Sequence, residues 1–313
     1  MKWIFVLIAL LFTGLVACTT EEANDGITGA LHRIEYGNNV VYLFGTMHAG
    51  HPDWFPLADV VEDALRGADV VFTEIGVDNA AIQSAFNNTL FLPGNMTWRQ
   101  YLPEDKYNHL VETLETWGVL RPSRVMNPAI IIWELELSIS LELSELDGDF
   151  DNSVDMYVAN VALELGIPVY ALENLERTFD IVYNLPFEVM LAGIAGFLPK
   201  EQFIEALADV DNPTVDDFGF YYANNDFDSI NNLYALELDS EDLYTVYVSD
   251  EIANRRSIYM AQDISRLLKE TEAPTTFFIA AGLSHVIRSR IGDEHTDIIQ
   301  QLKLTDFIII PLY

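Results

Sequence analysis

Cysteine and basic residues are scarce in this chain of 313 residues. It has 1 Cys, which excludes a disulfide scaffold, a Cys-based zinc site and an iron–sulfur cluster. Its 16 Lys and Arg stand against 49 Asp and Glu, which gives a formal net charge of −33. Such a chain is repelled by phosphate backbones, so we expect no nucleic-acid partner. A solvated acidic surface that tolerates high salt is the simplest interpretation of the charge.

Several motifs of well-known enzyme classes are also missing. The chain contains no HExxH, no GxSxG and no GxxxxGK[ST]. By contrast, apolar residues make up 50% of the chain and aromatic residues 12%. That composition excludes a disordered chain and is typical of a globular protein with a large core.

The first segment has the features of an export signal. Residues 1–17 contain one positive charge and an apolar run, Trp3–Phe12, that is short for a membrane-spanning helix. Leu15–Ala17 directly precede Cys18 and resemble a bacterial lipobox, which implies cleavage before Cys18 and lipidation of its thiol. Residues 18–28 would then be a polar tether. We expect an extracytoplasmic protein, lipid-anchored to a bacterial membrane on its periplasmic side or at the cell surface; a plain signal peptide and an uncleaved anchor are the alternatives.

Apolar runs alternate with helical periodicity through residues 29–313, which we interpret as one domain. The predicted strands are Val40–Phe44, Ala68–Glu74, Ile167–Glu173, Thr275–Ala281 and Phe307–Leu312. Pro56–Gly67 has an amphipathic helical pattern and joins the first two strands in a βαβ unit. Residues 80–146 and 174–268 are predicted to be mostly helical, with 80–150 as a helical insertion. The expected fold is α/β, with a mixed, largely parallel central sheet and long helical insertions.

Four predicted strands end in a residue that can bind a metal or carry a proton. The motif GxxH follows two of them, as Gly45–His48 and Gly282–His285, and Glu74 and Glu173 end the other two. Because active sites of open α/β sheets lie at the carboxyl ends of the strands, we expect these side chains to share one site. Imidazole combined with carboxylate suits Zn, Mn, Fe or Co better than Ca or Mg. A Gly at the strand end predicts a sharp turn of the backbone.

Taken together, these blocks resemble the TraB/GumN family, which includes the pheromone-shutdown protein PrgY and the animal Tiki proteins. The similar segments are Tyr42–His48, Pro56-Leu57, Ala68-Asp69, Glu74, Thr97–Gly118, Val154-Asp155, Gly166–Val169, Leu172-Glu173, Arg256, Met260-Ala261 and Gly282–His285. They occur in the family's order across nearly all of residues 30–313. One departure is Ser257 after Arg256, where the family usually has Asn.

The resemblance implies a metal-dependent peptidase for the Tiki branch and a less defined activity for the bacterial members. It also implies kinship with haem-binding lipoproteins and erythromycin-esterase-like hydrolases. On this basis we expect His48 and His285 to bind a divalent metal, Mn, Co or Zn, with Glu74 as the first choice for a third ligand. Glu173 would act as general base, and the two glutamates could exchange these roles.

Two further residues are assigned supporting roles. Asp155 is expected to orient a metal ligand or to belong to a helix surface. Arg256 is expected to neutralise a substrate carboxylate or to pair with an acidic core residue. The expected function is a membrane-anchored hydrolase of peptides or proteins. The alternatives are a non-catalytic lipoprotein that binds haem, metal or peptide, and an ester hydrolase of small molecules.

Overall fold

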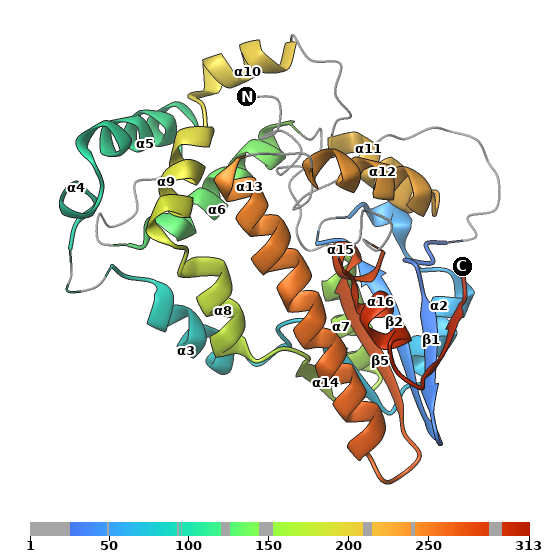
Figure 1. The fold of residues 1–313 in the computed structure, drawn as a ribbon. Coiled ribbons are helices and arrows are strands. Elements are labelled where there is room, and N and C mark those ends of the chain that lie inside the picture. Colours follow the sequence, from blue (N-terminus) through green and yellow to red (C-terminus); the bar gives the residue numbers. More distant parts are fainter. Residues whose placement is uncertain are drawn as a thin grey trace.

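A six-stranded mixed sheet forms the centre of the protein (Figure 1). In sheet order its strands are β4 (Val169–Ala171), β3 (Val70–Thr73), β5 (Thr276–Gly282), β2 (Asn39–Thr46), β1 (His32–Tyr36) and β6 (Ile308–Pro311). The first four strands of this order are parallel, whereas β1 is antiparallel to both of its neighbours. The predicted α/β fold with a largely parallel sheet is therefore confirmed.

The computed structural model describes residues 26–48, 50–92, 94, 96–119, 126–143, 153–208, 215–238, 242–287 and 296–313. The predicted signal segment 1–17, Cys18 and most of the predicted tether lie outside these residues. All five strands predicted from the sequence are present. The strand β1 was not predicted; it forms a tight hairpin with β2, in which Tyr36 pairs with Asn39 and Gly37 has a φ of +60°.

The central strands are in a register that brings their carboxyl ends together. In the parallel pair β2–β5, Thr46 lies opposite Gly282, and in the pair β3–β5, Thr73 lies opposite Ala280. Strand β5 separates β2 from β3, so the predicted βαβ unit has a third strand between its two strands. The two GxxH motifs consequently leave neighbouring strands at the same edge of the sheet.

Helices cover both faces of the sheet. On one side lie α2 (Asp59–Arg66) and α7 (Val154–Glu164), which contact each other, and on the other lie α14 (Arg256–Glu270) and α16 (Ile298–Lys303) (Figure 1). The helices η1 (Pro52–Trp54), α11 (Val215–Ala223), α12 (Phe227–Leu238) and α15 (Leu283–Val286) complete this part. Its core is built on fully buried strand residues such as Leu43, Val71 and Phe278.

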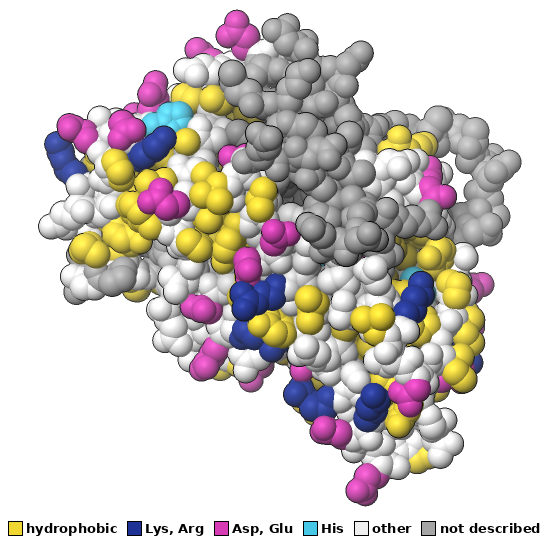
Figure 2. Space-filling view, viewed as in Figure 1, with side chains coloured by type: hydrophobic (Ala, Val, Ile, Leu, Met, Phe, Trp, Pro, Cys, Tyr) yellow, Lys and Arg dark blue, Asp and Glu magenta, His cyan; other side chains and the backbone are white. Residues whose placement is uncertain are grey.

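A second core holds the helical insertion together. Its helices are α3 (Asn79–Thr89), α4 (Trp98–Tyr101), α5 (Glu104–Thr116), α6 (Pro128–Leu143), α8 (Leu175–Tyr183), α9 (Phe187–Gly196), α10 (Lys200–Ala208) and α13 (Leu243–Tyr247). Leu110, Ile131 and Met190 are buried in this core, so the helical body includes segments well beyond residue 150. Figure 2 shows hydrophobic side chains gathered on its surface around α9 and α13, among scattered acidic ones.

Among the described residues, no single helix is long and apolar enough to cross a membrane. The pair α8 and α9, bent by 59°, meets the length and composition test only when the two are taken together. In α9, Val189 and Met190 are buried inside the helical core.

Three consecutive helical segments connect the two cores. They are α13, a π-helical stretch, η4 (Val248–Arg255), and α14. Ile252 of the stretch packs in the helical core, whereas Met260 and Ile264 of α14 pack in the sheet core. π-Helical segments are rare and occur frequently at functional sites. Here the segment ends immediately before Arg256.

Candidate functional site

The guanidinium of Arg256 joins the two glutamates at the strand ends. Its Nη2 donates to Glu74 Oε2 over 2.5 Å and to Glu173 Oε2 over 2.6 Å. Its Nε lies 3.1 and 3.2 Å from the two Glu173 oxygens. The side chains of Arg256, Glu74 and Glu173 are 10%, 9% and 0% exposed. Arg256 therefore ties buried acidic residues, one of the two roles expected for it.

His285 has one ring nitrogen fixed by a hydrogen bond. The hydroxyl of Ser257 lies 2.7 Å from the carbonyl oxygen of Ala253, to which it donates, and 2.8 Å from His285 Nδ1. Because a hydroxyl has one hydrogen, Ser257 Oγ must accept from the Nδ1–H of His285. The other ring nitrogen, Nε2, then carries the lone pair, and it lies 4.0 Å from Glu74 Oε1.

His48 is held in the same way by a carboxylate. Its Nδ1 donates to Asp155 Oδ2 over 2.9 Å, and the hydroxyl of Thr46 donates to Asp155 Oδ1 over 2.6 Å. Asp155 lies in the first turn of α7, which begins directly after the N-cap Ser153. The His48 ring is 48% exposed and therefore open to solvent on one side. The Asp155 carboxylate raises the pKa of His48 to about 9.

The glycine that ends β5 is where the polar side chains meet. A Cβ added to Gly282 would lie 3.0 Å from Glu74 Oε1, 3.6 Å from His285 Cδ2 and 3.7 Å from His48 Nε2. The N–H of Gly282 itself donates to Glu74 Oε1 over 2.6 Å. A cluster of two imidazoles and one carboxylate is thus packed against the bare Cα of Gly282.

The glycines of the two GxxH motifs are needed for space and not for a positive φ. Neither Gly45 nor Gly282 adopts a positive φ; that of Gly282 is −50°. What both positions require is space, because a Cβ on Gly45 would lie 2.6 Å from Leu283 Cδ1 and 2.8 Å from the carbonyl oxygen of Gly29. The glycines therefore permit close approach of neighbouring groups.

The two glutamates have pKa values shifted in opposite directions. Burial alone would raise the pKa of Glu74, but Arg256 and the two histidines lower it below its ordinary value. For Glu173 burial dominates and raises the pKa, with Arg256 opposing. Pairs of carboxyl groups whose environments separate their pKa values are typical of acid–base sites.

A cavity of about 340 Å³ opens beside this cluster. One side is polar and includes His48, Glu74 and Arg256. The rest of the lining is largely apolar and includes Ile75, Val77, Met156, Ala159, Phe179, Val182 and Tyr183. The cavity lies where the sheet meets α7 and α8, and its size suits a small ligand or a few residues of a peptide.

A family model described as TraB/PrgY/gumN family matches residues 30–296. The chain belongs to this family. No curated protein and no solved structure gives a significant match to it.

A metal ion is one candidate ligand of the polar cluster in this TraB/PrgY/gumN member. Within the described ranges, no three His, Cys, Asp or Glu side chains form a ready-made metal cluster. The donor chemistry nevertheless fits, because His48 and His285 each have Nδ1 held by a hydrogen bond and Nε2 on the side of Gly282 or Glu74. Since the pKa of His48 is raised to about 9, a metal bound there would displace a proton from its ring. Glu74 is the carboxylate that lies beside both histidines at Gly282, with its Oε1 4.0 Å from His285 Nε2 and bonded to the N–H of Gly282.

All six expected site residues inside the described ranges come together here: His48, Glu74, Asp155, Glu173, Arg256 and His285. Sequence reasoning missed two supporting residues, Thr46 and Ser257. Ser257 was noted only as a departure from the family's Asn. Its position beside Arg256, in the first turn of α14, is the signal that could have identified it.

Proposed function

We propose that this TraB/PrgY/gumN protein is a metal-dependent hydrolase that cleaves peptides in the cavity beside His48 and Glu74. The observation that carries the proposal is the pair of histidines with hydrogen-bonded Nδ1 atoms. Metal-binding histidines commonly donate their other N–H to a carboxylate or another oxygen acceptor, which fixes the tautomer and the ring orientation.

The roles of the chain's own groups follow from this arrangement. The Nε2 atoms of His48 and His285 and the carboxylate of Glu74 would hold Mn, Co or Zn. When bound, such a metal polarises a carbonyl and lowers the pKa of a coordinated water. The lowered pKa of Glu74 keeps it anionic, as a ligand must be. Glu173, with its raised pKa, is the group suited to take a proton from the attacking water and to deliver it to the leaving amine.

The apolar wall of the cavity supports a peptide as the substrate. Phe179 and Tyr183 stack with ring centroids 5.4 Å apart, and Val182 and Met156 line the cavity as well. Such a wall would bury an apolar side chain next to the scissile bond, while the polar side would face its carbonyl.

A non-catalytic binding protein for haem, metal or peptide is the second candidate. It is favoured by one observation: both glutamates are paired with Arg256, so neither is free as a base in this conformation. The substitution Glu173→Gln separates the two functions, because it would abolish hydrolysis and spare capture of a ligand.

The decisive experiment measures metal content and peptide cleavage together. The full chain, purified without chelator, is compared with His48→Ala and His285→Ala, and with His51→Ala as a control outside the cavity. We expect one metal ion per wild-type and control chain, and none in the two site variants. Stoichiometric metal in either site variant would refute the site, and bound metal without cleavage of any peptide would favour the binding function.

We also propose the extracytoplasmic, lipid-anchored location suggested by Cys18. Lipidation requires the thiol, so Cys18→Ser should release the protein from the membrane fraction of a bacterial host. Persistence of the variant in that fraction would argue for an uncleaved anchor.

A further inference from the structure

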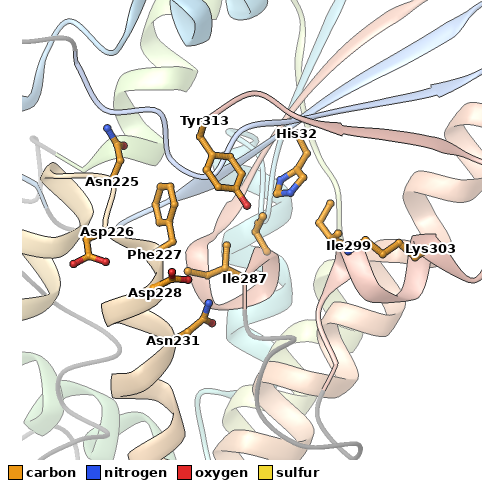
Figure 3. A pocket seen from close by; sticks show the side chains of 11 residues that line it. His32, Asn225, Asp226, Phe227, Asp228, Asn231, Ile287, Ile299, Lys303 and Tyr313 are labelled. Carbon is orange, nitrogen blue, oxygen red and sulfur yellow. The ribbon is translucent and has the colours of Figure 1, made fainter.

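A second cavity, of about 330 Å³, lies on the other side of β5 from the proposed active site. It is enclosed by the beginning of α12, by β1 and by α15 and α16, and none of its lining residues lines the first cavity. Figure 3 shows residues from these distant parts of the chain facing one another across it. Its volume is at the lower end of the range for small-ligand pockets.

The middle of this cavity is aromatic and apolar. The ring of Tyr313 packs edge-on against Phe227, with centroids 5.0 Å apart, and against His32, with centroids 5.3 Å apart (Figure 3). Ile287 and Ile299 complete the apolar surface. A ligand here needs a short apolar body.

One buried hydrogen-bond acceptor in this cavity, the side-chain oxygen of Asn231, lacks a donor in the described part of the chain. The side chain of Asn231 is buried, with the residue 7% exposed, and its Oδ1 has no hydrogen-bond partner among the residues that the structure describes. His32 Nδ1 donates to the carbonyl oxygen of Ala30 over 2.7 Å, so its Nε2 is an acceptor. Burial lowers the pKa of His32 to about 4, which keeps the ring neutral. A buried acceptor without a donor is unfavourable, and this favours occupation by a ligand with N–H groups.

Opposite charges lie at the two ends of the cavity. Figure 3 shows Lys303 at one end, beyond Ile299, and Asp226 and Asp228 at the other. Lys303 is close enough to His32 to contribute to its lowered pKa. The cavity is therefore polarised, with its unpartnered amide oxygen on the acidic side.

We propose that this cavity binds a small zwitterion of the amino-acid type with an apolar side chain. The ammonium donates to Asn231 Oδ1 on the acidic side, the carboxylate faces Lys303, and the apolar side chain packs on Phe227 and Tyr313. The site is independent of the proposed peptidase chemistry, since it shares no residue with that cavity.

The test is isothermal titration of the full chain with L-leucine and two analogues. We expect L-leucine to bind, and both 3-methylbutylamine, which lacks the carboxylate, and 4-methylpentanoate, which lacks the ammonium, to bind at least ~10-fold more weakly, a loss of ~1.4 kcal/mol each. Equal binding of either analogue would overturn the zwitterion assignment, and so would the absence of heat with millimolar leucine, methionine and phenylalanine.

Substitutions in the cavity test whether L-leucine binds there. Asn231→Leu and Lys303→Met should each weaken L-leucine at least ~10-fold. Asn232→Leu, on the next and exposed position of α12, is the matched control and should bind as wild type. Since Lys303 is exposed, its variant keeps the test valid if the buried Asn231→Leu variant does not fold. Unchanged affinity in Lys303→Met would overturn the proposed orientation.

Discussion

The hydroxyl of Ser257 accepts a hydrogen bond from the Nδ1–H of His285 over 2.8 Å and donates a hydrogen bond to the carbonyl oxygen of Ala253. Ser257 is fully buried and directly follows Arg256, whose guanidinium joins Glu74 to Glu173. The first turn of α14 thus sets the orientation of one histidine and of both carboxylates. One rigid helix end controls the geometry of groups that come from three different strands.

Ser257→Ala should weaken metal binding without removing it. The substitution leaves Nδ1 of His285 without its acceptor, so the ring loses the bond that fixes its tautomer, and loss of such an outer partner typically costs ~10–100-fold in metal affinity. Titration of the apo-protein with Mn or Zn measures the effect, and Thr305→Ala on the surface serves as the control. Wild-type affinity in Ser257→Ala would show that His285 is not a ligand.

Gly282→Ala should abolish metal binding while the protein stays folded. The added Cβ would lie 3.0 Å from Glu74 Oε1 and 3.7 Å from His48 Nε2, so it occupies the space between the proposed ligands. The backbone itself tolerates alanine, because φ is −50°. Gly67→Ala is a matched control, with a nearest contact of 3.1 Å to a backbone oxygen far from the site. Retention of a full metal equivalent in Gly282→Ala would contradict the proposed arrangement.

Strand positions and site residues were accessible from the sequence because local patterns encode them. The run Val40–Phe44 is apolar and ends at Gly45, and it became the long strand β2. The pairing of His48 with Asp155 spans 107 residues in sequence, and no local pattern specifies it. The short, partly charged strand His32–Tyr36 was not predicted, because its own composition does not indicate a strand. The signal that could have identified it is the Gly37-Asn38 turn that follows it.

Arg256→Met should strongly destabilise the protein, and neutralising Glu74 and Glu173 as well should restore most of the lost stability. Removing the guanidinium leaves Glu74 and Glu173 as buried carboxylates without a cation, which typically costs ~3–5 kcal/mol. The triple variant Glu74→Gln/Glu173→Gln/Arg256→Met removes that charge as well. Urea denaturation of the single and triple variants measures the difference in the free energy of unfolding. A loss below ~1 kcal/mol in Arg256→Met would show that the charges are not buried as described.

The position of Arg256 explains why the roles of Glu74 and Glu173 could not be assigned from the ends of the predicted strands alone. Glu74 and Glu173 both end apolar segments, and in sequence they are equivalent candidates for ligand or base. In the folded chain Glu74 also accepts from the N–H of Gly282, whereas Glu173 is fully buried against Arg256. Their pKa values shift apart only through this tertiary environment, to which sequence position gives no access.

Acid should destabilise the protein partly through His32, far from the proposed active site. Burial lowers the pKa of His32 in the folded chain from 6.5 to about 4, so as the pH falls the unfolded chain binds this proton first. The stabilisation from the neutral ring is therefore complete above pH ~6.5 and is lost as the pH falls toward 4, up to ~3 kcal/mol in total.

The variant His32→Asn isolates this contribution. An Asn side chain can still donate to the carbonyl oxygen of Ala30 but does not titrate. Urea denaturation at pH 7.5 and pH 4.5 should show a smaller loss of unfolding free energy in the variant than in wild type, because all other titrating groups are common to both. Identical losses would mean that His32 becomes protonated in the folded chain without cost, which its burial beside Tyr313 and Lys303 argues against.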